Sequence, residues 1–126
     1  MNRRVHVVDD HELTRKHLRT VLAHHGYEVA LSEGAAQARV QLLQTPPDLV
    51  LMDLQMPGEN GWQLLAWMRQ QPSLAGVPVI CVTASMGVED ERLRAAGFVQ
   101  LLPKPITPPA RLLTAVRAAL GDDAAP

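Results

Sequence analysis

Residues 49–58 read LVLMDLQMPG, and this stretch decides the fold. Four apolar residues, Leu49 to Met52, precede Asp53 without the polar alternation of a half-exposed strand. Continuous apolar runs of this length are typical of strands covered on both faces, as in a parallel sheet. Pro57 and Gly58 follow as turn-forming residues. The stretch therefore predicts a buried strand with a carboxylate at its carboxyl end.

Short apolar runs of the same kind recur along the chain and alternate with stretches of helical spacing. The expected strands are Val5–Val8, Tyr27–Leu31, Leu49–Leu54, Val77–Thr83 and Phe98–Leu102. The expected helices run through Thr14–Leu22 to a stop at Gly26, then over Ala35–Gln44, Trp62–Gln71, Val88–Ala96 and Thr107–Leu120. Strands and helices that alternate over short connections predict an α/β fold, a parallel sheet with helices on both faces.

The helical spacing also predicts which side chains face inward. One stripe of the first helix contains Thr14, His17, Leu18, Val21 and Leu22. In the second helix, Ala38, Leu42 and Leu43 are expected inward. Thr107 is placed to cap the last helix, with two prolines in its first turn.

Composition limits the classes of protein that the chain can represent. Its 126 residues carry 12 Lys and Arg against 13 Asp and Glu, for a net charge near −1, and only 3% are aromatic. These values argue against direct nucleic-acid binding. No apolar stretch approaches the ~20 residues that cross a bilayer, and no signal peptide is evident. Cys81 is the only cysteine, which excludes an intrachain disulfide and suits a reducing, cytoplasmic setting. We expect one domain over residues 1–121, with 122–126 as a tail or the start of a linker.

Polar residues gather where the predicted strands end, and ligands of open parallel sheets bind at that edge. They are Asp9, Asp10, Asp53, Thr83 and Lys104. Each alone has a simpler reading, because an acidic pair often caps a helix and a Thr within Val-Thr-Ala is often only part of a strand. Together, three carboxylates repel one another unless a cation is present, and their hard oxygens suit Mg²⁺. The lysine and the hydroxyl add groups that bind a phosphoryl group, for which one carboxylate could be the nucleophile.

The whole constellation resembles the receiver domain of two-component response regulators, which is a CheY-like, flavodoxin-like (βα)5 fold. The matching segments are Val-Val-Asp9-Asp10, Leu-Met-Asp53-Leu-Gln-Met-Pro57-Gly, Val-Thr83-Ala84 and Leu-Pro-Lys104-Pro105. They extend over the chain from Arg4 to about Leu120. The resemblance implies a phosphorylation-controlled binding module that catalyses only its own phosphorylation and dephosphorylation.

The resemblance also implies a role for each residue of the site. Asp53 would accept a phosphoryl group from a sensor histidine kinase or a histidine phosphotransfer protein. Asp10, Asp53 and the backbone carbonyl of Gln55 would bind Mg²⁺, or Mn²⁺ in its place, and Asp9 would hold a metal-bound water. Thr83 and Lys104 would bind the phosphoryl oxygens, and the Lys104–Pro105 peptide bond is expected to be cis.

Phosphorylation would then bias the face formed by the fourth helix, fifth strand and fifth helix. That face would contact a downstream effector or a second copy of the chain. One departure from the family pattern affects this switch: many receivers carry Tyr or Phe three residues before the lysine, where this sequence has Leu101. The residues that tune phosphoryl lifetime in the family are here Gln55 and Ser85.

The remaining residues of chemical interest have plainer interpretations. We expect His6 to be satisfied by a neighbour within its strand, His24 and His25 to lie in solvent, and His11 to be able to approach the rim of the site. Cys81 reads as a buried strand residue. Trp62 and Trp67 are expected on the third helix, one of them packed against the sheet.

Two alternatives remain at this point. A pseudo-receiver would use the same fold as a constitutive interaction module, and Leu101 is the residue that keeps this reading open. A small phosphohydrolase would need an additional acid or base, or a cap over the site, for which the chain has no room. The sequence does not identify the kinase, the output, the phosphoryl lifetime, the oligomeric state or whether a larger regulator contains this domain.

Overall fold

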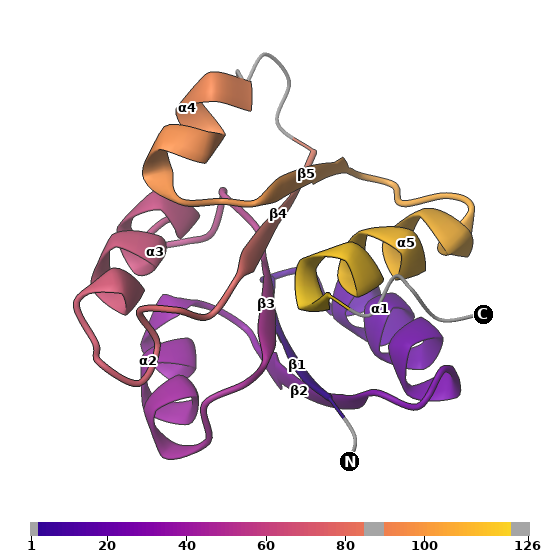
Figure 1. Cartoon of the computed structure of the whole chain (residues 1–126), viewed down its shortest axis with the longest axis horizontal. Helices are drawn as coiled ribbons and strands as arrows, with labels where there is room; N and C mark the ends of the chain where they lie inside the picture. The colour runs from indigo at the N-terminus through magenta and orange to yellow at the C-terminus, as the bar shows by residue number, and fades with distance from the viewer. Residues whose placement is uncertain (1–2, 85–89, 122–126) are drawn as a thin grey trace.

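Five parallel strands form one sheet in the computed structural model, which describes residues 3–84 and 90–121 (Figure 1). The strands are β1 (Arg4–Val8), β2 (Glu28–Ser32), β3 (Leu49–Met52), β4 (Val79–Thr83) and β5 (Gln100–Pro103), in the spatial order β2-β1-β3-β4-β5. The helices are α1 (Glu12–His24), α2 (Ala35–Gln44), α3 (Gly61–Arg69), α4 (Asp90–Ala96) and α5 (Pro109–Leu120). This is the predicted flavodoxin-like α/β fold.

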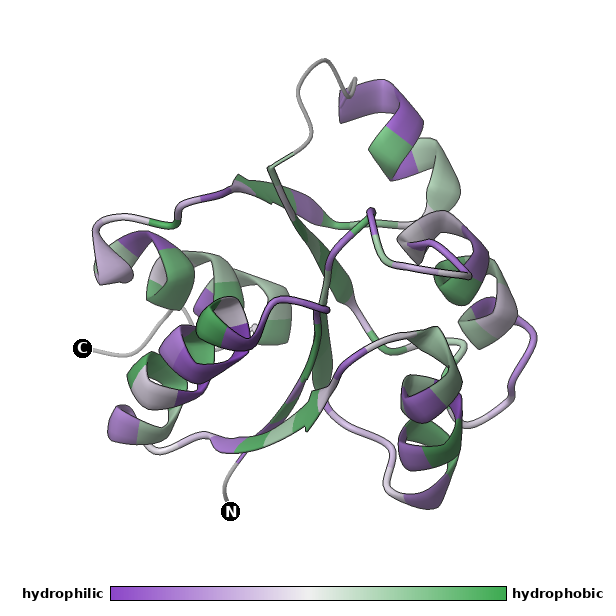
Figure 2. Ribbon diagram, turned by 180° about the vertical axis from the view of Figure 1, so that it is seen from behind, coloured by the Kyte–Doolittle hydropathy of each residue, from purple (hydrophilic) through white to green (hydrophobic). Residues whose placement is uncertain are grey.

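Helices cover both faces of the sheet, which explains why β3 is apolar throughout and β4 is apolar up to Thr83 (Figure 2). Every residue of β3 and β4 is buried. Helices α1 and α5 lie on one face, where Leu18, Leu22 and Leu112 pack against Val7 and Ile80. Helices α2, α3 and α4 lie on the other face. Their core residues there include Leu42, Leu64, Leu65 and Leu93, together with Val50 and Met52 of the sheet.

The predicted second helix has the bounds found for α2, and the other described elements lie within a few residues of their predicted ranges. Residues 85–89 and 122–126 lie outside the described residues. They include Ser85, the expected first residue of the fourth helix at Val88, and the expected tail.

Three predictions about individual residues were wrong. His17 is exposed, because only Leu18 and Leu22 of the predicted stripe reach the core fully. Leu43 is 48% exposed, since α2 faces the sheet through Ala35, Ala38 and Leu42. The last helix begins at Pro109 with Pro108 as its N-cap, and no side-chain hydrogen bond caps it. Prolines have no N–H, so this helix start offers fewer donors for a capping Thr107.

His6 is buried in β1 and is satisfied by β2, as expected. Its Nε2 lies 2.6 Å from Ser32 Oγ, and Ser32 Oγ donates to Gln41 Oε1 over 2.7 Å. Because the single hydroxyl proton is used by Gln41, Ser32 accepts from His6, whose Nε2 therefore carries a hydrogen. Burial lowers the pKa of His6 to about 4, so the imidazole is neutral at pH 7.

Arg69, the last residue of α3, fastens several loops at the end of the sheet opposite the strand carboxyl ends. Its Nη1 donates to the carbonyl oxygens of Leu74, Ala75 and Val77. Its Nη2 donates over 3.2 Å to the carbonyl of Gly97, which directly follows α4. One guanidinium thus joins the α3–β4 connection to the C-terminal end of α4.

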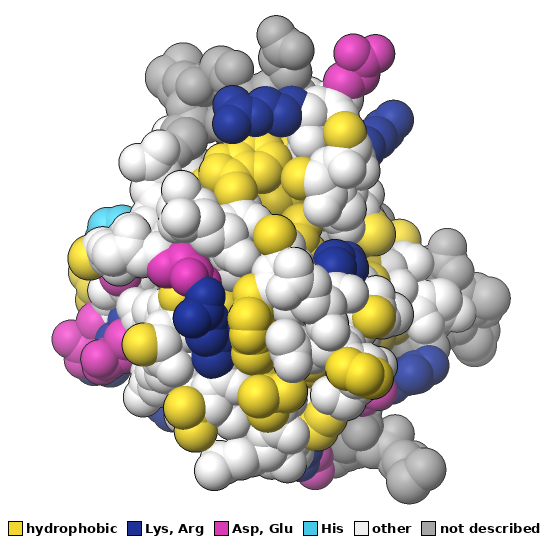
Figure 3. All heavy atoms as spheres, turned by 90° about the vertical axis from the view of Figure 1, so that its left-hand side faces the viewer, with side chains coloured by type: hydrophobic (Ala, Val, Ile, Leu, Met, Phe, Trp, Pro, Cys, Tyr) yellow, Lys and Arg dark blue, Asp and Glu magenta, His cyan; other side chains and the backbone are white. Residues whose placement is uncertain are grey.

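The third helix carries two half-buried tryptophans on the face that α2, α3 and α4 share. Arg92 of α4 lies over Trp62 at 4.6 Å, and Arg39 of α2 lies over Trp67 at 5.5 Å. Trp62 also meets the buried Phe98 edge-on, with ring centroids 5.5 Å apart. Figure 3 shows this face, where hydrophobic side chains lie beside Lys and Arg side chains. Both tryptophans therefore pack against neighbouring helices through cation–π contacts.

Candidate functional site

Asp9 and Asp10 leave the carboxyl end of β1, where hydrogen bonds hold the chain in place. The Asp9 amide donates to the Ser32 carbonyl over 3.1 Å, and Arg15 Nη1 donates to the Asp9 carbonyl over 2.8 Å. The Asp9 side chain is buried, whereas that of Asp10 is 26% exposed. The acidic pair does not cap α1, whose N-cap is His11 without a side-chain cap.

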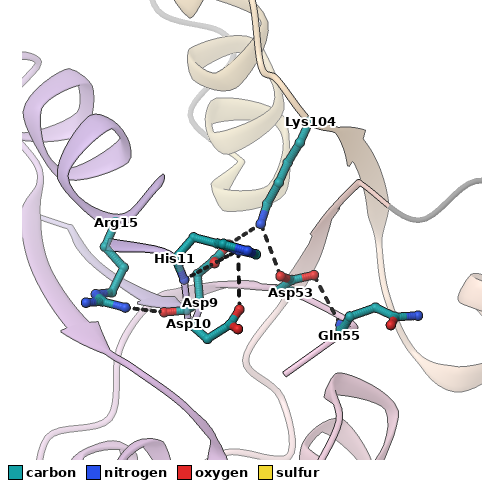
Figure 4. A network of polar contacts seen from close by, with 7 residues as sticks. All are labelled: Asp9, Asp10, His11, Arg15, Asp53, Gln55 and Lys104. Atoms are coloured by element: carbon teal, nitrogen blue, oxygen red, sulfur yellow. Dashed lines mark hydrogen bonds and ion pairs between the residues drawn. The ribbon is translucent and has the colours of Figure 1, made fainter. Parts of the chain in front are cut away.

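Asp53 follows β3 at the same edge of the sheet. Its amide donates to the Val8 carbonyl over 3.0 Å, and its side chain is only 3% exposed. Asp53 Oδ1 accepts from the Gln55 amide over 3.2 Å, which orients the carboxylate (Figure 4). A Cβ at Gly61, the first residue of α3, would lie 2.3 Å from the Asp53 carbonyl oxygen, so only glycine fits beside the Asp53 backbone.

Lys104 reaches the carboxylates from the loop after β5. Its amide donates to the Thr83 carbonyl, and its Nζ lies 2.7 Å from Asp9 Oδ2 and 3.1 Å from Asp53 Oδ2. Burial opposes the charged form of Lys104, but contacts with both carboxylates outweigh it and raise the pKa of the ammonium. Lys104 is therefore a firmly charged cation. The Lys104–Pro105 bond that follows is cis.

Thr83 ends β4 beside β3 and is buried, so it lies at the same edge as the three carboxylates. Gln55 is exposed and its side chain points away from the carboxylates (Figure 4). The proposed role of its carbonyl stays a prediction. Leu101 is half-buried on β5 and packs against the α2–α3–α4 core.

The charges of this site suit a divalent cation. Three carboxylates face a single ammonium, which leaves two formal negative charges. Asp10 Oδ1 is buried and makes no hydrogen bond within the described part of the chain. Ligand atoms of Asp9, Asp10, His11 and Asp53 all lie within 4.8 Å of one another. A donor set dominated by hard carboxylate oxygens fits Mg²⁺.

Sequence reasoning brought the five principal residues together but missed Arg15. The signal was available, because a helix that starts just after the acidic pair carries residue 15 back over its own first turn. His11, expected near the rim, lies 3.2 Å from Asp9 Oδ1 through its Nδ1.

An apolar groove lies beside Lys104. Its volume is 410 Å³, and it runs between α1 and the loop that leads to α5. It is lined by Leu13, Thr14, His17, Leu18, Ala84, Lys104, Pro105, Ile106 and Thr107. Leu13 is 82% exposed although it is apolar. None of the described helices is long and apolar enough to cross a membrane.

Comparisons with known proteins agree with this site. Residues 5–117 match the family described as the response regulator receiver domain. The polar-differentiation response regulator DivK of Brucella ovis is 34% identical over 97% of this chain and 99% of its own length. The chemotaxis protein CheY4 of Vibrio cholerae has a similar structure, with a TM-score of 0.89, 25% identity, and coverage of 95% of this chain and 100% of its own. The receiver domain of a histidine kinase from Syntrophus aciditrophicus is also similar, with a TM-score of 0.82, 27% identity, and coverage of 94% and 90%.

Proposed function

The chain belongs to the response regulator receiver family, and from this premise we propose that Asp53 accepts a phosphoryl group in a Mg²⁺-dependent reaction. Receiver domains of this family act in two-component signal transduction. The observation that carries the proposal is the setting of Asp53. Its buried carboxylate is held by the Gln55 amide and by the Lys104 ammonium at 3.1 Å, next to two further carboxylates.

In the proposed reaction, a carboxylate oxygen of Asp53 attacks the phosphorus of a phosphohistidine. The new oxygen–phosphorus bond forms as the phosphorus–nitrogen bond breaks, and the imidazole leaves as a neutral group after it takes up a proton. Lys104 neutralises charge on the phosphoryl oxygens, and the Thr83 hydroxyl donates to one of them. Mg²⁺ held by Asp10, Asp53 and the Gln55 carbonyl, with Asp9 holding a bound water, would supply further neutralisation.

The added phosphoryl group brings roughly −1.5 to −2 charges to one point. Lys104 and Thr83 are drawn toward it. This movement biases the face of α4, β5 and α5, which we propose as the contact for an effector or a second copy of the chain. The domain catalyses its own phosphorylation and dephosphorylation and acts on no other substrate.

The groove beside Lys104 supports a protein as the phosphodonor. Its apolar lining and the exposed Leu13 suit an apolar helix surface, and Lys104 joins the groove to Asp53. A sensor histidine kinase or a histidine phosphotransfer protein that presents an apolar helix beside its phosphohistidine would fit this groove. These partners would place the domain in the cytoplasm.

The alternative of a constitutive pseudo-receiver is not favoured, because Asp53, Lys104 and the acidic pair are all present in one cluster. The test is the intact mass of the protein after incubation with Mg²⁺ and acetyl phosphate, beside Asp53→Asn. One added phosphoryl group in the native protein alone is the expected result. Labelling of Asp53→Asn would show a different acceptor. A native protein that neither gains mass, even with a phosphorylated histidine donor, nor binds beryllofluoride with Mg²⁺ would support the pseudo-receiver.

A further inference from the structure

His11 places an imidazole among the carboxylates of the site. Its Nδ1 lies 3.2 Å from Asp9 Oδ1 and 3.3 Å from Asp10 Oδ1 (Figure 4). The backbone holds it there, since the His11 amide donates to Asp9 Oδ1 over 2.9 Å. The side chain is 64% exposed, so the ring can turn toward a cation that enters from solvent.

These separations match those between neighbouring ligands of a single metal ion. Two ligand atoms that bind one ion at right angles, each about 2.1 Å away, lie about 3.0 Å apart. The His11 nitrogen lies close to this distance, at 3.3 Å, from Asp10 Oδ1, which is a direct ligand in the proposed site. The ligand atoms of all four residues, Asp53 included, fit within 4.8 Å.

We propose that His11 Nδ1 is a metal ligand and that it shifts the preference of the site from Mg²⁺ toward Mn²⁺. Imidazole nitrogen binds first-row transition ions better than it binds Mg²⁺, which favours all-oxygen ligand sets. Among those ions, Mn²⁺ also accepts an octahedral set rich in carboxylates. This inference rests on the proposed function, because it assumes that the carboxylate cluster holds the cation that serves Asp53.

A simpler role for His11 would be to hydrogen-bond the two carboxylates. In that role the imidazole competes with any cation equally, whatever the identity of the ion. The two roles therefore differ in selectivity: a ligand changes the ratio of Mn²⁺ to Mg²⁺ affinity, whereas a hydrogen-bonding partner leaves the ratio unchanged.

The experiment measures Mn²⁺ and Mg²⁺ binding to the full chain by titration calorimetry, with native protein, His11→Ala and the matched control His24→Ala, an exposed histidine at the far end of α1. His11→Ala should weaken Mn²⁺ binding about tenfold or more, by analogy with the loss of groups that support metal ligands, and leave Mg²⁺ binding nearly unchanged. The control should leave both affinities at their native values. An unchanged ratio in His11→Ala would overturn the inference.

A second measurement reads the ligand directly. With Co²⁺ in place of Mn²⁺, a ligating imidazole shows a strongly shifted N–H proton resonance, which should be present in native protein and in His24→Ala and missing from His11→Ala. If the same resonance persists without His11, the inference is wrong. If the native protein binds Mg²⁺ but His11→Ala changes neither affinity, the His11 inference is wrong and the proposed function stands. If the native protein binds neither Mn²⁺ nor Mg²⁺, both the His11 inference and the proposed function lose their basis.

Discussion

Gly61 lies so close to Asp53 that a Cβ atom on the glycine would stand 2.3 Å from the aspartate carbonyl oxygen. The Gly61 amide also donates to the Leu54 carbonyl over 2.9 Å. The start of α3 and the backbone of Asp53 and Leu54 are therefore in direct contact. Displacement of either one must move the other.

We predict that Gly61→Ala lowers both stability and phosphorylation. The added methyl group has to displace the Asp53 backbone, at a cost of roughly 1–3 kcal/mol in the free energy of unfolding. Denaturant unfolding and the rate of labelling by acetyl phosphate would measure the two effects. Gly76→Ala is the control, because a Cβ there meets no atom within 4 Å. Equal behaviour of the two variants would contradict the prediction.

Lys104→Met should bind Mg²⁺ more tightly than the native protein while it fails to be phosphorylated. Without the ammonium, Asp9 and Asp53 lose the cation that now lies 2.7 and 3.1 Å from them. The variant should unfold at a lower temperature without metal and gain more from added Mg²⁺. Thermal unfolding across a Mg²⁺ series is the measurement. If added Mg²⁺ raised the unfolding temperature of both proteins by the same amount, Lys104 would not compete with the metal.

His6 should make the fold sensitive to acid. Its pKa is about 4 in the folded protein and 6.5 when free, so the unfolded chain binds more protons between these values. The stability contribution of neutral His6 is complete above pH 6.5, falls as the pH drops, and is lost at about pH 4. For a pKa shift of this size, the free energy of unfolding can fall by at most about 3 kcal/mol over this pH range.

The variant His6→Gln keeps a donor for Ser32 but does not titrate, so its stability should fall less than that of native protein between pH 6.5 and 4. Denaturant unfolding at several pH values measures this difference, with the exposed His24→Gln as control. Parallel pH profiles for native protein and His6→Gln would refute the assignment.

Trp62 should report movement of α4. In a Trp67→Phe background its indole touches α4 through Arg92 and meets Phe98 edge-on. Beryllofluoride with Mg²⁺ should therefore shift Trp62 emission, and Asp53→Asn should abolish the shift. Unchanged emission in protein shown by mass to carry beryllofluoride would mean that α4 keeps its place over α3.

We predict that the environment of Leu101 changes little when the domain is activated. Leu101 is already half-buried and packed against the α2–α3–α4 core, and it has no ring to move inward. Methyl NMR signals of Leu101 should shift less on activation than those of core methyls next to Trp62, such as nearby leucines of α3. A large shift confined to Leu101 would refute this.

The sequence was sufficient for the order of elements because continuous apolar runs and helical stripes are local signals. That Asp9, Asp53 and Lys104 lie at one edge of the sheet could be predicted from topology alone, because the carboxyl ends of parallel strands lie at the same edge. The side that His17 and Leu43 face depended on how each helix is rotated against the sheet, which a stripe of mixed polarity does not determine. The ion pairs of Lys104 depend on the path of the loop after β5, for which the sequence carries no periodic signal.

The hydrogen bond from Arg69 to the carbonyl of Gly97 anchors the C-terminal end of α4. The helix is seven residues long, or about 10 Å. Its C-terminal end is tied through Gly97 to the third helix, whereas its N-terminal end adjoins the loop that follows Thr83. A tilt of about ten degrees around the tied end would swing the other end by about 2 Å over that length. A rotation of this size about the tied end would therefore change the angle of α4 on the face that we propose as the contact for an effector.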